Sequence, residues 1–162
     1  MATLDIGPGK NIQPHFDRPV IRVDRRREVK PHVVADARAL PFRGGAFSTV
    51  YASHILEHFH WKEASNVLQE WARVVSADGE LQVMVPNLEW SALQITHGIV
   101  DEFVMNALFG RQENHLDVHR SGFVPTSLRD LIWRTGLCKL NEIETRTFRN
   151  SILIFAKRTQ DG

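Results

Sequence analysis

Short apolar runs alternate with loops and helix-like stretches along most of the chain. Runs rich in Val and Ile predict strands, and apolar residues spaced i, i+3, i+4, i+7 predict amphipathic helices. The strands are expected at residues 3–6, 20–23, 32–35, 47–52, 80–85, 138–145 and 151–156. This alternation is typical of an α/β domain with a mostly parallel sheet. Because only a few residues separate the last two strands, these are expected to form an antiparallel hairpin.

Helical spacing is found in three stretches. The clearest is residues 61–76, which carries a regular apolar stripe and is expected to end at Asp78-Gly79. Residues 88–109 predict one broken or two short helices, interrupted near Gly98, and residues 125–135 predict another. With the seven strands they predict a single domain over residues 1–162.

The connection after the first strand is short. Ten residues lie between Gly9 and Val20, and two of them are Pro14 and Pro19, so a full crossover helix does not fit. Any helix there is expected to be a single turn. One flank of the sheet should then be thinly covered, and because open apolar surface favours association, a homo-oligomer is expected.

Composition and charge narrow the class of protein. With 43% hydrophobic and 24% charged residues, the 162-residue chain fits an ordinary soluble globular domain. No apolar run approaches the roughly 18 residues of a membrane span, and the N-terminus lacks the layout of a signal peptide. The single Cys138 rules out an internal disulfide, so a cytoplasmic location is expected. The net charge of +1 gives no general attraction to nucleic acid or anionic membranes.

Three successive strand ends carry residues suited to a nucleoside ligand. A Gly-x-Gly turn, Gly7-Pro-Gly9, directly follows the first strand, and glycine lets backbone approach a ligand closely. Asp24 ends the second strand and is suited to both ribose hydroxyls, and Asp36, after the third, is suited to an adenine amino group. A dinucleotide fingerprint needs a third glycine where Ile12 stands, so NAD is disfavoured.

Five segments follow one another in a recognisable order. They are LDIGPG at 4–9, VD at 23–24, ADARALPF at 35–42, FSTVYASHILEHF at 47–59 and EWARVVSADGELQVMVPN at 70–87. This set resembles class I S-adenosylmethionine (SAM) methyltransferases. Two later segments, ALFGRQ at 107–112 and DVHRSGF at 117–123, resemble a short type-11-like branch whose genes often accompany surface-polysaccharide glycosyltransferases. The resemblance implies a Rossmann-like fold, SAM as cofactor and methyl transfer as activity.

The resemblance also implies a cofactor site at the ends of the first four strands. Its residues are Asp5, Gly7, Gly9, Asp24, Asp36, Ala37, Ser53 and His54. The first three surround the methionine and ribose parts of SAM. The next three hold the ribose and recognise adenine, and the last two face the methyl group. In the loop after the first strand, Pro8 and Lys10 replace the small residues common in the family, which leaves the detailed geometry of that loop open.

The stretch H-I-L-E-H at 54–58 also matches the H-x-x-E-H pattern of one class of zinc peptidases. That class needs the motif inside a long helix, whereas here it directly follows a strand, so a peptidase is rejected. Two interpretations remain. The segment is structural, or His54, Glu57 and His58 bind a divalent metal with His115 or His119, as E-x-x-E-H does in some O-methyltransferases. We expect no metal, because i+3 splays away from the i, i+4 pair and the sequence does not place a further ligand.

The chemistry of methyl transfer asks little of the protein. Because the sulfonium methyl is already activated, the protein has to align the acceptor and exclude water. For an alcohol acceptor, a nearby base contributes about 10²–10⁴-fold. His54, by its position, and His119, by its motif, are the candidate bases, and a hydrogen-bonded structural histidine is the alternative for either.

The methyl acceptor is not identified by any motif. The fifth strand is followed by Val85-Pro86-Asn87 rather than Asn/Asp-Pro-Pro-Tyr, which lowers the odds of a nucleic-acid amino-methyltransferase. The leading prediction is methyl transfer to a small molecule or sugar, at oxygen. The alternative is a SAM-binding protein without methyl transfer, which serves as a partner subunit or regulatory module.

Overall fold

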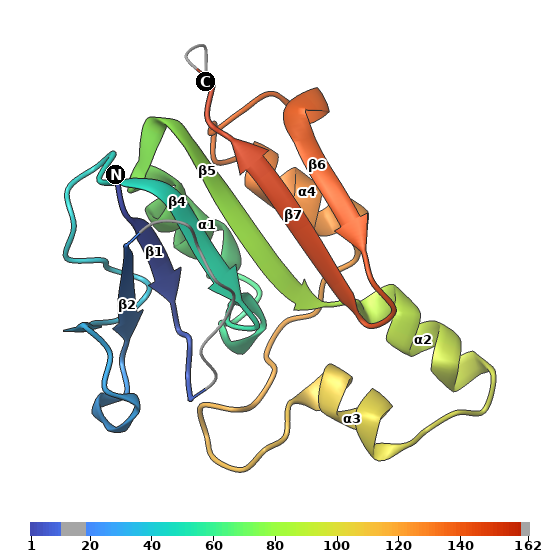
Figure 1. Ribbon diagram of the computed structural model, residues 1–162. Helices are drawn as coiled ribbons and strands as arrows, with labels where there is room; N and C mark the ends of the chain where they lie inside the picture. Colours follow the sequence, from blue (N-terminus) through green and yellow to red (C-terminus); the bar gives the residue numbers. More distant parts are fainter. Residues whose placement is uncertain (11–18, 160–162) are drawn as a thin grey trace.

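A seven-stranded sheet forms the centre of the computed structural model, which describes residues 1–10 and 19–159 (Figure 1). The strands are β1 Thr3–Ile6, β2 Val20–Asp24, β3 Val33–Val34, β4 Phe47–Ser53, β5 Val75–Pro86, β6 Ile143–Thr147 and β7 Ser151–Lys157. The helices are α1 Ala64–Arg73, α2 Leu88–Thr96, α3 Glu102–Phe109 and α4 Pro125–Trp133. Short 3-10 turns are η1 Arg27–Val29, η2 Leu56–His58 and η3 Leu140–Glu142.

The order of the strands is that of a Rossmann-like α/β fold with an antiparallel end. Across the sheet it is β3-β2-β1-β4-β5-β7-β6. The five strands from β3 to β5 are parallel, and β7 pairs antiparallel with both β5 and β6. The predicted fold class and the predicted C-terminal hairpin are therefore confirmed.

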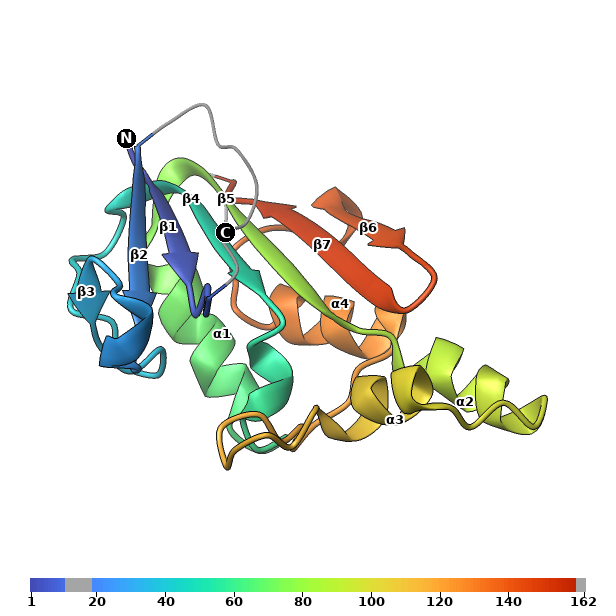
Figure 2. The same cartoon turned by 60° about the horizontal axis from the view of Figure 1, so that its bottom comes forward.

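Helices cover one face of this sheet. Because crossovers between parallel strands are right-handed, connections that lead along the sheet toward β3 lie on one of its faces. Connections that lead toward β5 lie on the other face. In the described part of the chain, only the η1 turn belongs to the first set, whereas α1 and α4 pack together beneath the second face (Figure 2). The row in contact with the helices is Leu4, Val50, Leu81 and Ala156. The neighbouring row is Asp5, Tyr51, Gln82 and Phe155. The face without described helices is thus partly polar.

The first helix is shorter than its sequence pattern predicts. Its apolar stripe packs as expected, with Trp71 fully buried. However, α1 ends at Arg73, and Asp78-Gly79 lies inside β5 rather than ending the helix. Strand β4 holds this segment instead, because the Phe47 amide donates to the Val74 carbonyl at 3.0 Å.

The later elements follow the predicted pattern with one exception. Residues 88–109 form two helices that are broken at Gly98, whose φ of +75° suits glycine. The strand predicted at 138–145 begins only at Ile143, because residues 140–142 form η3 and the Lys139 amide donates to Glu142. The predicted single turn between Gly9 and Val20 falls mainly on residues outside the described part. No described helix is long and apolar enough to cross a membrane.

Candidate functional site

The glycine turn at the end of β1 is fixed by close packing. Gly7 and Gly9 have φ values of +64° and +62°, which L side chains rarely adopt. The Gly7 amide donates to the Val23 carbonyl at 2.8 Å. A β-carbon on Gly7 would lie 2.1 Å from Cδ1 of Ile55, so the turn after β1 touches the segment after β4. The two segments form adjacent walls of one site.

Asp5 lies just before this turn, on the face without described helices. Its side chain is buried, with the residue 2% exposed. Burial raises the pKa of Asp5 to about 6, and the Arg22 guanidinium, 3.9 Å away, opposes this rise. The nearby Asp24 carboxylate adds to it. A carboxylate held in this way is poorly compensated at neutral pH.

Asp24 ends β2 with every acceptor position used. Its Oδ1 accepts from the Arg26 amide at 2.9 Å and from Arg26 Nε at 3.1 Å. Its Oδ2 accepts from Arg26 Nη2 at 3.0 Å and from the Gly9 amide at 3.3 Å. Burial opposes ionisation, but these hydrogen bonds hold the pKa of Asp24 below its usual value. Two carboxylate oxygens accept about four hydrogen bonds, so a further ligand has to displace one of these donors.

Asp36 repeats the same arrangement after β3. It accepts from the Arg38 amide at 2.9 Å, from Nε at 3.1 Å and from Nη2 at 2.8 Å, and these contacts lower its pKa. Its side chain is 35% exposed, against 3% for Asp24. The next residue, Ala37, is buried, and its carbonyl accepts from Trp71 Nε1 at 3.0 Å. The sequence analysis missed the arginines, although the repeated Asp-x-Arg spacing was there to find.

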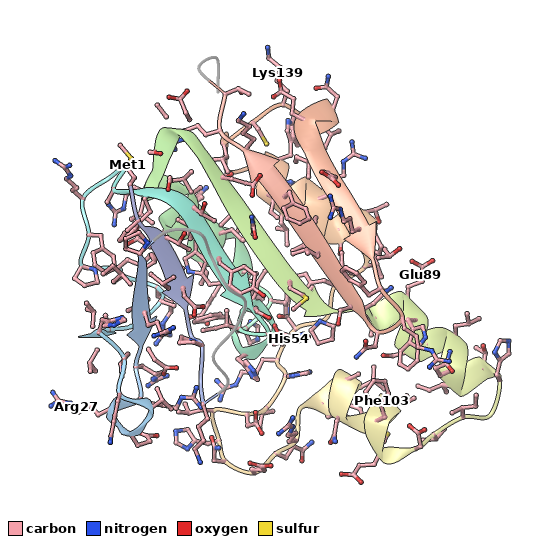
Figure 3. All side chains as sticks on the ribbon, in the orientation of Figure 1. Met1, Arg27, His54, Glu89, Phe103 and Lys139 are labelled. Carbon is pink, nitrogen blue, oxygen red and sulfur yellow. The ribbon has the colours of Figure 1, made fainter. Side chains whose placement is uncertain are left out.

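The end of β4 places His54 at the same edge of the sheet (Figure 3). Ser53 is the last residue of the strand, and His54 follows with a φ of +52°, an unusual conformation for a residue with a β-carbon. The His54 amide donates to the Met84 carbonyl at 2.9 Å, which holds this turn. Its ring is 43% exposed, and Nδ1 lies 3.3 Å from Oε1 of Glu57. His54 is therefore the accessible imidazole of the site.

A distant segment completes the site beside η2. The Glu57 carbonyl accepts from the amides of Arg120 at 2.7 Å and Ser121 at 3.1 Å, which ties residues 118–121 to the end of β4. His119 Nε2 consequently lies 3.9 Å from Glu57 Oε1, and the His58 and His119 rings are 5.0 Å apart. Burial lowers the pKa of His119. His115, the other candidate ligand, is exposed and outside the described three-residue cluster.

A small cavity adjoins the same carboxylate. Its volume is about 20 Å³, close to that of one water. Its lining residues are Glu57, Pro86, Leu88, Ala107, Leu108, Ser121, Gly122 and Phe123. The cavity therefore lies where the segments around α2 and α3 meet η2.

Comparisons with known proteins bear on this geometry. Residues 4–83, from β1 into β5, match the family described as methyltransferase domain. Residues 4–83 therefore belong to a SAM-dependent methyltransferase domain. The matched residues include the glycine turn, both strand-end aspartates and the His54–His58 stretch. No curated protein sequence matches the chain at a significant level.

Solved structures share the fold of this methyltransferase domain. One is the 1,6-didemethyltoxoflavin-N1-methyltransferase of Burkholderia thailandensis with bound S-adenosylhomocysteine, at 15% identity and a TM-score of 0.61, over 98% of this chain and 71% of that one. An O-methyltransferase family protein from the same organism gives 16% and 0.68, over 99% and 52%. A putative Haloferax volcanii methyltransferase, in a complex with a methyltransferase activator, gives 10% and 0.65, over 99% and 83%.

Proposed function

We propose that this methyltransferase domain transfers the methyl group of SAM to an oxygen of a small-molecule or sugar acceptor. The observation that carries the proposal is the convergence of three features at one edge of the sheet. These are the glycine turn after β1, the aspartates after β2 and β3, and the imidazoles of His54 and His119 beside Glu57. Ligands of open α/β sheets bind outside the carboxyl ends of the strands.

The cofactor residues fit SAM if one side chain moves. Gly7 and Gly9 give the turn after β1 a conformation that L side chains rarely adopt, and the buried Asp5 precedes this turn. Asp24 is the acceptor for the ribose hydroxyls once Arg26 gives way. The Arg26 side chain is 32% exposed, so it has solvent to move into. Asp36 and Ala37 complete the proposed contacts toward adenine, and Ser53 completes those toward methionine.

The histidines supply the base that an alcohol acceptor needs. SAM brings a methyl group activated by a sulfonium, and the side chains have only to hold the acceptor and take its proton. His54 is the first candidate because its ring is accessible and follows the strand end directly. His119 is the second. Its Nδ1 lies 3.1 Å from the Ala107 carbonyl, and because a carbonyl only accepts, Nε2 is the atom free to take a proton.

We infer the class of acceptor from the similarity of this chain to other proteins. The solved structures of the same fold include a 1,6-didemethyltoxoflavin-N1-methyltransferase and an O-methyltransferase family protein. The later motifs resemble a branch linked to surface-polysaccharide genes, which favours a sugar. The single Cys138 is the ground on which we keep a cytoplasmic location as a proposal.

A SAM-binding protein without methyl transfer is the second candidate function. All acceptor positions of Asp24 are filled by the chain's own Gly9 and Arg26, so cofactor binding has to compete with an internal contact. A structurally similar chain is found in a complex with a methyltransferase activator. Either feature fits a subunit that depends on a partner.

Transfer from labelled SAM to a panel of sugars, phenols and amines separates the two functions. We expect label in a hydroxylated acceptor, and a loss of about 10²–10⁴-fold in rate for His54→Ala with SAM affinity retained. His97→Ala, at the exposed end of α2, is the matched control and should keep full activity. SAM binding by calorimetry without transfer to any acceptor would favour the second function.

We also propose self-association, for a different reason from the one the sequence suggested. The sheet face without described helices is partly polar, so it is a weak driving force for association. Exposed apolar side chains gather instead on α2 and α3, namely Leu93, Ile95, Phe103, Met105 and Phe109. Exposed apolar patches of this kind favour association. Light scattering at rising concentration should show a dimer or larger species, and a monomer throughout would contradict this.

A further inference from the structure

The Glu57 carboxylate is buried without a hydrogen-bond partner among the described residues. Glu57 is 1% exposed, and both of its carboxylate oxygens lack a donor there. His54 Nδ1, at 3.3 Å, is close to Oε1 but does not make a hydrogen bond with it. A buried carboxylate without donors or a counter-ion is unfavourable, because nothing replaces its hydration. A bound positive charge would therefore stabilise the Glu57 carboxylate.

Two imidazoles near this carboxylate each keep an acceptor atom. His58 Nδ1 lies 3.2 Å from the Val118 carbonyl, and His119 Nδ1 lies 3.1 Å from the Ala107 carbonyl. A carbonyl oxygen only accepts, so each Nδ1 carries the hydrogen and each neutral ring is left with a lone pair on Nε2. His119 Nε2 is 3.9 Å from Glu57 Oε1. Acceptor thus faces acceptor, with no hydrogen between them.

We propose that Glu57, His58 and His119 bind a divalent first-row transition cation of the zinc or manganese type. One ligand atom from each residue lies within 4.8 Å of the other two, so small side-chain movements bring all three onto one ion. Metal-binding histidines commonly donate their other ring N–H to a backbone carbonyl, as both do here. Two imidazoles and one carboxylate suit such cations, whereas Mg²⁺ and Ca²⁺ prefer oxygen ligands.

The structure removes the reason for which the sequence predicted no metal. That reason was a ligand count, since the sequence did not place His115 or His119. Backbone hydrogen bonds to Glu57 now bring His119 to η2, and His54 is not required. With a cation bound, His119 is a ligand and the role of base falls to His54. The ion would join the segment between α3 and α4 to the end of β4, whether or not methyl transfer takes place.

Metal content and thermal unfolding of the full chain test this proposal independently of activity. After treatment with chelator and dialysis against Zn²⁺, Mn²⁺ or Mg²⁺, elemental analysis should find one Zn²⁺ or Mn²⁺ per chain and no Mg²⁺. At about a hundredfold excess over the dissociation constant, the bound ion should raise Tm by roughly 5–10 °C. His58→Ala and His119→Ala should each weaken binding by more than the roughly 10–100-fold that loss of an orienting partner costs.

Two further variants guard against misfolding and against adventitious binding. Glu57→Gln removes the unpaired charge, so it should raise the Tm of the metal-free protein while weakening Zn²⁺ binding; a purely structural role for Glu57 gives no such opposite pair. His115→Ala, an exposed histidine nearby, should bind Zn²⁺ as the unmodified chain does. Equal Zn²⁺ content in the unmodified chain and in a folded His58→Ala/His119→Ala double variant would overturn the proposal.

Discussion

Two parts of one sheet edge differ in whether their carboxylates are paired with a donor. After β2 and β3, Asp24 and Asp36 are each neutralised by the arginine two residues on. After β4, Glu57 is buried with no donor among the described residues. The first part is complete without a ligand, so a ligand has to displace a side chain. The second part is incomplete, so it gains by binding a charge. Burial alone therefore does not identify a binding site, and the partners of each oxygen have to be counted.

The two parts are joined by the packing of Gly7 on Ile55. Gly7→Ala adds a β-carbon 2.1 Å from Ile55 Cδ1 at a φ of +64°, so strain and overpacking act together. We expect a loss of about 2–5 kcal/mol of unfolding free energy and no measurable SAM binding. Denaturant unfolding measures the first and calorimetry the second.

Gly98→Ala is the matched control for this variant. Gly98 has a similar φ of +75°, but nothing lies within 4 Å of an added β-carbon. It should therefore lose only the strain, about 1–2 kcal/mol. Equal losses in the two variants would mean that the contact between the two parts is soft.

Asp5 should make stability depend on pH. Its pKa is about 6 in the folded chain against 3.8 for the free residue, so the folded state binds more protons between these values. Stability should fall as pH rises from about 4 to 6. Asp5→Asn removes this titration, so its stability relative to the unmodified chain should rise across that window by about 1–3 kcal/mol. Denaturant unfolding at pH 4.5 and 7.5 measures the change, and a constant difference would contradict it.

The two aspartates should differ in their effect on SAM binding. Asp24→Ala leaves two ribose hydroxyls without an acceptor, which should weaken SAM binding by about 1–3 kcal/mol. Asp36→Ala should cost less, because the Asp36 side chain is 35% exposed and water can replace it. Calorimetry compares both with the unmodified chain. Unchanged affinity in Asp24→Ala would remove Asp24 from the proposed site.

The sequence predicted most of the fold because the information was local. Val and Ile runs located β1, β2, β4 and β7 to within a residue at each end. The errors came where tertiary contacts outweigh local preference. Val75 continues the apolar spacing of α1, yet pairing with Phe47 of β4 draws it into β5. The apolar spacing within one segment does not reveal this competition between helix and strand.

The candidate site was predicted only in part for the same reason. Asp24, Asp36 and His54 follow strands directly, so strand prediction places them at one edge. His119 is 62 residues beyond Glu57 in the sequence, and only the amides of Arg120 and Ser121 bonding to the Glu57 carbonyl bring it there. The burial of Glu57 is likewise a property of the packed chain.

The smallest expected effect tests whether the first part really has to open. Arg26→Met keeps the length of the side chain but frees two of the four acceptor positions of Asp24. The backbone amide of residue 26 still donates, so two positions become available to the ribose. A partly exposed ion pair contributes about 1 kcal/mol or less, so SAM should bind no more than roughly fivefold more tightly. Arg38→Met, at the more exposed pair, should change affinity less. If Arg26→Met instead weakens SAM binding, Arg26 supports the cofactor rather than competing with it, and the contrast between the two parts of the edge disappears.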